Sequence, residues 1–173
     1  RGFVKPLIGF WYNDNPTPKV RSYGRFTSKV GDRIDWATFT GPPAHTSKEE
    51  QIAFEWNPYE PTPLPSDRTA FINNHMRRPK PGVNPTFFSV RWTGKLLIPN
   101  DGLYTFFFDR LDDGGRLFID RNDDGKLEPI IDAWYIQQAN PAAKPVRLKK
   151  GLHDIVIQYC QGPEWCNSII FSW

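Results

Sequence analysis

The feature that most constrains the fold is a series of short apolar segments, separated by turn residues, in the C-terminal half of the chain. They read TFFSVRWTGKLLIP, GLYTFFFDR, RLFID, PIIDAWY, VRLKKGLHDIVIQYC and NSIIFSW. In the first of them Phe88, Val90 and Trp92 alternate with polar residues, as in a strand with one buried face. Many short strands with little helix between them are typical of a β-sandwich or a barrel. The sequence therefore predicts an all-β, antiparallel, sandwich-like or barrel-like domain.

The N-terminal half fits this fold class less completely. The segment LIGFWYN and the region around Ile34 and Trp36 are predicted to be strands. Residues 41–84 contain about half of the 17 prolines, and proline cannot donate a hydrogen bond to a sheet. We therefore expect a long Pro-rich insertion at 41–84 with at most short elements, including a helical turn or two in SKEEQIAFEW. We also expect the first and last strands to pair.

Size and charge narrow the class of protein. A chain of 173 residues fits one domain, so we expect a single domain over residues 1–173. The net charge of +3 is scattered, which does not favour nucleic acid as a partner. No apolar stretch is long enough to cross a bilayer, so membrane insertion is not expected. Because the sequence begins at Arg1, we expect a domain excised from a larger secreted protein.

The two cysteines, Cys160 and Cys166, flank the short segment QGPEW. A zinc site is disfavoured because no further pair of cysteine or histidine ligands stands near them. A local disulfide is the favoured interpretation, and it would place the protein in an oxidising compartment, outside the cell or at its surface. The alternative is two unpaired thiols in a cytosolic protein.

The segment LDDGGRLFID places Asp112 directly before Asp113 at a glycine-rich turn. Adjacent carboxylates repel each other, and no common turn type requires such a pair. Either the turn is acidic and simply solvated, or a cation binds there. In both cases we expect the pair to sit at a solvent-facing turn.

Taken together, these segments resemble the PA-fourteen domain, a family named after the N-terminal fragment of anthrax protective antigen. The resemblance rests on FSVRWTG, GLYTF, DDGGRLFID, IIDAW, VRLKKG and the closing Trp173. It covers residues 85–173 well and the opening segments LIGFWYND and GDRIDW more weakly, and residues 41–84 have no evident counterpart. It implies antiparallel strands in a domain that occurs in secreted glycosidases, adhesins, toxins and signalling proteins, usually as a carbohydrate-binding module.

In the sugar-binding adhesins of this family, similar to the flocculins, a cis peptide joins two adjacent aspartates that bind one calcium ion. Sugar hydroxyls complete the shell of six to eight oxygens that calcium prefers. The resemblance implies that Asp112 and Asp113 are calcium ligands, that Asn167 is a third ligand, and that Gly114 lets the backbone come close. These four residues and Trp165 are the expected sugar-binding residues. Trp165 would either stack on a sugar ring or pack against the disulfide.

A second calcium site is conceivable in the segment DRNDDGKLE. Asp120, Asn122 and Asp124 alternate ahead of a glycine, as in the first half of an EF-hand loop. Ile131 stands where the bidentate glutamate belongs, so Glu128 or Asp132 would have to substitute for it. A metal-free Asp-Gly hairpin turn is the favoured alternative.

No catalytic motif stands out. There is no recognisable Ser-His-Asp order and no recognisable pair of glycosidase carboxylates, so we expect a non-enzyme, such as an accessory module of a glycoside hydrolase or an adhesin. The predicted function is a calcium-dependent carbohydrate-binding module of a secreted or cell-surface multidomain protein. Its partners would be glycan ends and other domains of the parent chain. The alternative is a protein-interaction or architectural domain whose acidic turns are only solvated.

Overall fold

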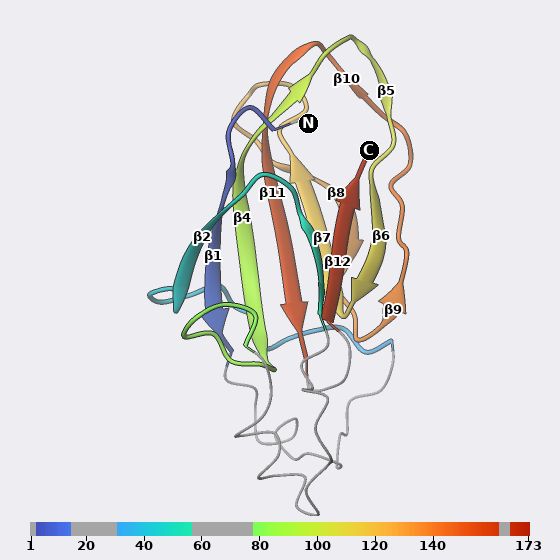
Figure 1. The fold of residues 1–173 in the computed structure, drawn as a ribbon. Coiled ribbons are helices and arrows are strands. Elements are labelled where there is room, and N and C mark those ends of the chain that lie inside the picture. Colours follow the sequence, from blue (N-terminus) through green and yellow to red (C-terminus); the bar gives the residue numbers. More distant parts are fainter. Residues whose placement is uncertain (1–2, 15–30, 57–77, 163–166) are drawn as a thin grey trace, which may run out of the picture.

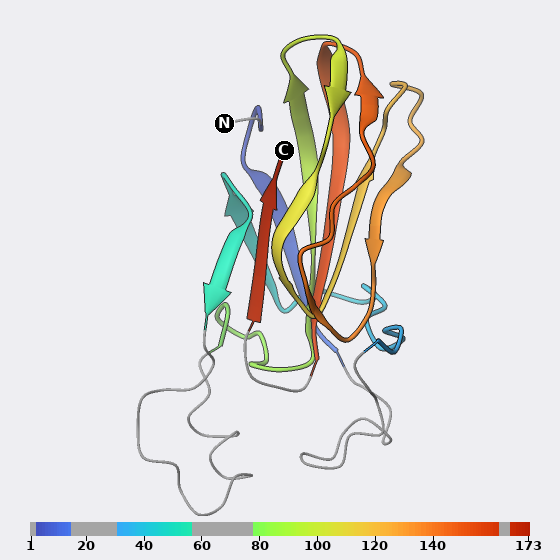
Figure 2. The same cartoon turned by 90° about the vertical axis from the view of Figure 1, so that its right-hand side faces the viewer.

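The computed structural model describes residues 3–14, 31–56, 78–162 and 167–173. In these residues the chain forms strands that pair antiparallel and build two sheets facing each other, as Figures 1 and 2 show. The predicted all-β, antiparallel sandwich is therefore confirmed. In the described ranges, no helix has the length and apolarity needed to cross a membrane.

The larger sheet has six strands in the order β2-β1-β4-β11-β7-β8. Its centre is formed by β4 (Phe88–Ile98) and β11 (Gly151–Gln161), which pair along their whole length. The other members are β1 (Leu7–Asn13), β2 (His45–Glu49), β7 (Gly114–Ile119) and β8 (Glu128–Ala133).

The smaller sheet has four strands in the order β3-β12-β6-β9. These strands are β3 (Ala53–Trp56), β12 (Asn167–Ser172), β6 (Phe107–Asp112) and β9 (Gln138–Ala139). A separate pair, β5 (Gly102–Tyr104) and β10 (Val146–Leu148), lies at one end of the sandwich (Figure 1).

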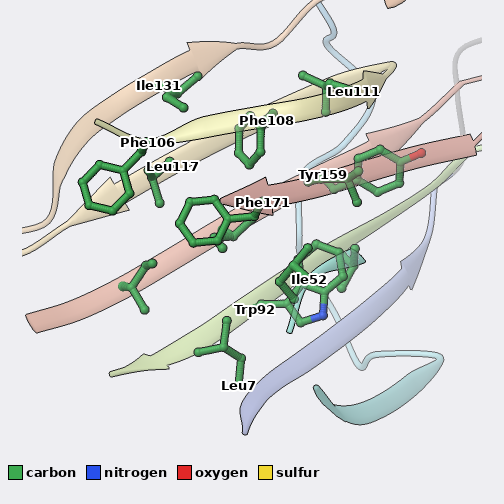
Figure 3. Packing of buried hydrophobic residues seen from close by; sticks show 14 of the residues in the cluster. Leu7, Ile52, Trp92, Phe106, Phe108, Leu111, Leu117, Ile131, Tyr159 and Phe171 are labelled. Carbon is green, nitrogen blue, oxygen red and sulfur yellow. The ribbon is translucent and has the colours of Figure 1, made fainter. Parts of the chain in front are cut away.

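The core lies between the two sheets and is rich in aromatic rings (Figure 3). Phe88, Val90 and Trp92 are fully buried there, as the alternation of β4 predicts. The ring of Phe54, from the smaller sheet, stacks on Trp92 at a centroid distance of 5.7 Å. A second apolar cluster, formed by Ile34, Trp36, Trp134 and Cys160, packs on the other face of the larger sheet. It explains why both faces of β11 are buried near the end of that strand.

The structure corrects the prediction for SKEEQIAFEW. This segment forms no helical turn but contributes to β2 and β3, which join different sheets. Strand β2 pairs with β1, and β3 pairs with β12, more than 100 residues further along the chain. Glu, Lys and Gln favour helices only weakly, so pairing with distant strands decides the outcome.

Two further strand predictions are wrong in detail. Ile34 and Trp36 are buried, but their segment adds only an isolated bridge between Arg33 and Tyr135 to the sheets. The segment GLYTFFFDR forms two strands, β5 and β6, in place of one. The first and last strands do not pair, since β1 lies between β2 and β4 and β12 lies between β3 and β6.

Candidate functional site

The pair Asp112–Asp113 lies where the chain crosses from one sheet to the other. Strand β6 of the smaller sheet ends at Asp112, and β7 of the larger sheet begins at Gly114, so Asp113 alone links them. The peptide bond between the two aspartates is cis, as the resemblance implies. The prediction that the pair sits at a solvent-facing turn is wrong, because the exposed fractions are only 7% for Asp112 and 6% for Asp113.

Asp113 is fixed by backbone amides on both sides. Its Oδ1 accepts a hydrogen bond from the amide of Gln137 at 3.2 Å, and its Oδ2 accepts one from the amide of Gly162 at 2.8 Å. A carboxylate has about four lone-pair positions, so each oxygen keeps room for one further ligand. The chain therefore fixes the orientation of the Asp113 carboxylate without filling its coordination capacity.

Asp112 is held differently. Its Oδ2 accepts a hydrogen bond from Nε2 of Gln138 at 2.7 Å, and the Tyr159 hydroxyl lies 2.5 Å from its backbone carbonyl oxygen. Within the described residues, Oδ1 of Asp112 receives no hydrogen bond. That oxygen remains available to a ligand.

Both carboxyl groups resist ionisation in this environment. Burial raises the pKa of Asp113 to about 7, with a further increase from the charge of Asp112, against the lowering effect of its two amide hydrogen bonds. Burial also raises the pKa of Asp112 to about 6, against the lowering effect of Gln138. Among the described residues, no Lys or Arg forms an ion pair with either carboxylate. The pair therefore carries negative charge that the described part of the chain does not compensate.

Two glycines permit the close packing around the pair. A Cβ atom on Gly114 would lie 2.5 Å from Cδ1 of Ile34, which supports the role that the resemblance implies for Gly114. A Cβ atom on Gly162 would lie 2.9 Å from Oδ2 of Asp113 and 3.3 Å from the Trp36 ring. The amide of Gly162 can approach Asp113 only because no side chain intervenes.

An open cavity of about 370 Å³ has Asp112 in its lining. Its lining includes Arg110, Gln138, Asn140 and Ser168, so polar side chains surround it. Ser168 stands opposite Asp112 in the pairing of β12 with β6, which places the backbone of Asn167 next to the site. Within the described residues, no three His, Cys, Asp or Glu side chains converge. A cation at this place would therefore need oxygens beyond the two carboxylates.

Some predicted site residues lie outside the described residues. Trp165 and Cys166 belong to the range 163–166, so the stacking role of Trp165 and the disulfide remain predictions. Cys160 is fully buried in the second apolar cluster, and burial raises the pKa of its thiol well above the usual range.

The residues considered for a second calcium site form hydrogen bonds within their own hairpin. Both carboxylate oxygens of Asp120 accept amide hydrogen bonds, at 3.2 Å from Asp124 and 2.7 Å from Gly125. Glu128 accepts a hydrogen bond from Nδ2 of Asn122 at 3.1 Å and pairs with Arg121, also at 3.1 Å. These contacts favour the metal-free hairpin, with β7 and β8 as its arms.

Sequence reasoning missed the residues that support the aspartates. Gln137 and Gln138 follow their aspartate partners by 24 and 26 residues and Gly162 follows Asp113 by 49, and no spacing pattern links them to the pair. Tyr159 offered a partial signal, because it stands near the end of the predicted strand segment VRLKKGLHDIVIQYC, which begins with a motif of the resemblance. The partner of its hydroxyl can be assigned only once β11 is placed beside β7 and in the sheet that faces β6.

Comparisons with known proteins agree with this architecture. Part of the chain is 36% identical over 84 residues to the anti-sigma-I factor RsgI3 of Acetivibrio thermocellus, covering 48% of this chain and 12% of that protein. An anti-sigma factor domain-containing protein from Clostridium clariflavum has a similar fold, with a TM-score of 0.61 at 20% identity. That match covers 99% of this chain and 42% of the other, so this chain spans less than half the length of either protein.

The fold is also similar to that of the A domain of epithelial adhesin 9 from Candida glabrata, solved in complex with Galb1-3GlcNAc. The TM-score is 0.54 at 15% identity, and the match covers 99% of this chain and 85% of the adhesin domain. A family model described as the PA14 domain matches residues 9–173. Because this match spans nearly the whole chain, including the crossover at Asp112–Asp113, the chain belongs to the PA14 domain family.

Proposed function

We propose that this chain is a calcium-dependent carbohydrate-binding module of a secreted or cell-surface multidomain protein. The observation that carries the proposal is the buried pair of carboxylates at Asp112 and Asp113, for which the described residues supply no cationic partner. Such a pair must either hold protons or neutralise its charge with a cation. At neutral pH a cation is the better solution, because the raised pKa values of about 6 and 7 still leave much of the pair ionised.

The donor atoms suit calcium. All available ligands are oxygens, and calcium takes six to eight of them in flexible geometry. Asp112 would contribute its free Oδ1, and Asp113 would contribute the remaining lone pairs of a carboxylate already oriented by two amides. Asn167 would add its side-chain oxygen from the start of β12. The ion would supply positive charge at the open end of the site.

A sugar would complete the arrangement from the cavity beside Asp112. Vicinal hydroxyls can supply two oxygens to a bound calcium ion, and the polar lining of the cavity can donate and accept hydrogen bonds. Gln138 would keep Asp112 oriented while the hydroxyls bind. Membership of the PA14 domain family and the fold shared with a sugar-bound adhesin domain support a glycan as the ligand.

The proposal has a direct experiment. A glycan array is probed with the protein in calcium and in chelator, alongside Asp113→Ala and the control Asp101→Ala, whose carboxylate lies on another turn and accepts the amide of Lys150. We expect weak binding, with a Kd of roughly 10 μM to 1 mM, since one shallow site buries little area. Binding should disappear in chelator and in Asp113→Ala, and persist in Asp101→Ala.

A protein-interaction or architectural domain is the second candidate. It is supported by the similarity to two anti-sigma factor proteins, whose names do not denote a lectin. Glycan binding that is equally strong in chelator and in Asp113→Ala would exclude the calcium mechanism. Absence of any glycan binding in calcium would favour the second candidate.

A further inference from the structure

A basic pocket lies at the opposite end of the sandwich from the two aspartates. It has a volume of about 410 Å³ and is lined by Arg121, Asn122, Asp123, Arg147, Lys149, Lys150, Gly151, Leu152 and His153. In Figure 1 this end carries β5, β10 and the start of β11, whereas Asp112 lies at the other end, where β6 terminates. The eight residue-to-residue steps of β11 from His153 to Gln161 separate the two places by roughly 25 Å.

The cations of this pocket have few partners. Arg147, Lys149 and Lys150 are exposed, and within the described residues none of them forms an ion pair. Arg121 pairs through one nitrogen with Glu128 at 3.1 Å, while its Nε is buried without a hydrogen-bond partner in the described part of the chain. Asp123 is the one acidic residue of the lining, so positive charge is in excess.

His153 contacts the two loops that carry Arg121, Lys149 and Lys150. Its side chain is only 4% exposed, with Nδ1 2.8 Å from the carbonyl oxygen of Asp120 and Nε2 2.9 Å from that of Lys149. The loop before β8 and the turn before β11 are thereby held together, and their cations face one pocket.

We propose that this pocket binds an oxyanion, a carboxylate or sulfate group, of an acidic polysaccharide. Converging arginine and lysine side chains make charge-assisted hydrogen bonds to such oxygens, and the partial enclosure of the pocket reduces their screening by solvent. The assignment of an oxyanion rests on the pocket alone. The choice of a polysaccharide as its carrier rests on the proposed carbohydrate-binding function.

The test uses three polymers with one backbone: dextran, carboxymethyl dextran and dextran sulfate. Binding is measured in chelator and at low salt, so that calcium does not contribute. We expect binding to at least one charged polymer and none to dextran, and the two charged arms distinguish carboxylate from sulfate. The variant Arg147→Ala/Lys149→Ala/Lys150→Ala should bind about tenfold more weakly or worse, since each charge-assisted contact contributes a substantial fraction of the affinity.

Two controls make the test specific. The variant Lys5→Ala/Lys48→Ala/Lys144→Ala removes the same charge from exposed positions that do not line the pocket, and it should retain binding within about threefold. Asp113→Ala should retain binding to the charged polymer, while the pocket variant should keep any calcium-dependent glycan binding. The two proposals can therefore fail separately.

Three results would overturn the proposal. Equal losses in both triple variants would mean attraction by net charge alone, and equal binding of dextran would mean that the anionic group is not recognised. Tighter binding of duplex DNA than of either charged polymer, lost in the same pocket variant, would make the occupant a nucleic acid. Circular dichroism of each variant verifies that the fold is retained.

Discussion

The hydroxyl group of Tyr159 lies 2.5 Å from the backbone carbonyl oxygen of Asp112. This contact joins the central strand of the larger sheet to the last residue of β6 in the smaller sheet. It fixes the backbone of the crossover from inside the protein, where Tyr159 is fully buried.

Replacing Tyr159 with Phe should therefore destabilise the fold without leaving a cavity. The Asp112 carbonyl would lose a buried partner, which costs about 1–3 kcal/mol of unfolding free energy. Urea denaturation measures the change. The matched control is Tyr104→Phe, whose hydroxyl donates to the carbonyl oxygen of Asn100 in an exposed contact and should change stability by under about 0.5 kcal/mol. Equal effects of the two variants would mean that the contact at Asp112 has no special weight.

The metal-free protein should lose stability as pH rises through the range where the two aspartates ionise. The pKa of Asp113 is about 7 in the folded state and about 3.9 in an unfolded chain, so between these values the folded state binds more protons. The unfolding free energy then falls with rising pH and levels off above about pH 7. For Asp113 the loss is roughly 2–4 kcal/mol, and Asp112, which is better screened by solvent, adds less.

Urea unfolding in chelator between pH 5 and 8 measures this slope. Asp113→Asn should remove most of it, because an amide does not titrate. Saturating calcium should also reduce it, since a bound cation favours the ionised carboxylates. A slope that is unchanged in Asp113→Asn would show that other groups control stability in this range.

Substitution of Gly162 by Ala should weaken calcium binding more than it weakens the fold. The new Cβ atom would lie 2.9 Å from Oδ2 of Asp113, so the amide hydrogen bond that orients this carboxylate would be displaced. We expect about tenfold weaker binding by calorimetry and a stability loss of about 1–3 kcal/mol. Gly102→Ala is the control, because its Cβ would meet only the Tyr104 ring at 3.7 Å. Unaltered calcium affinity in Gly162→Ala would argue against Asp113 as a ligand.

His153→Ala should be among the more destabilising single changes outside the core. It removes a buried ring that contacts two carbonyl oxygens, at 2.8 and 2.9 Å, so both contacts are lost. The expected cost is about 2–4 kcal/mol by thermal or urea unfolding. His45→Ala, at a half-buried position on the edge strand β2, should cost far less. A small effect at His153 would mean that water replaces the ring at both carbonyl groups.

Mass spectrometry after alkylation tests the predicted disulfide between Cys160 and Cys166. If Cys160 and Cys166 form a disulfide, alkylation in denaturant without reductant should leave the protein unmodified, and reduction should expose two thiols. Closing this short loop should stabilise the fold by roughly 2–3 kcal/mol. The denaturant is essential, because Cys160 is fully buried and would resist alkylation in the folded protein even as a free thiol. Two alkylated cysteines without reduction would contradict the prediction.

The strands of the C-terminal half could be predicted from sequence because their pattern is local. Alternation in β4 gives both its span and its buried face, as Phe88 and Trp92 show. The region 45–56 could not be predicted in the same way, since β2 and β3 depend on partners distant in sequence. Glu49 and Glu50 suggested a helix that tertiary pairing overrides.

In the candidate site, too, the local features could be predicted from the sequence and the features that depend on distant segments could not. Adjacent aspartates before a glycine can be recognised in the sequence. So can the resemblance to the PA-fourteen domain, which implies that these aspartates bind calcium. Their burial could not be predicted, because it depends on a crossover between sheets that no local pattern encodes. The same holds for Gly162 and Gln137, whose amides reach Asp113 only after the sandwich has closed.

The rings of Phe3 and Trp173, near the two ends of the described chain, are 5.7 Å apart. Both ends lie on the side of the molecule away from the tip of β6 (Figure 1). In any longer polypeptide, the segments before and after this domain would therefore attach close to each other. Neighbouring domains would then be joined at the end of the sandwich opposite the crossover at Asp112.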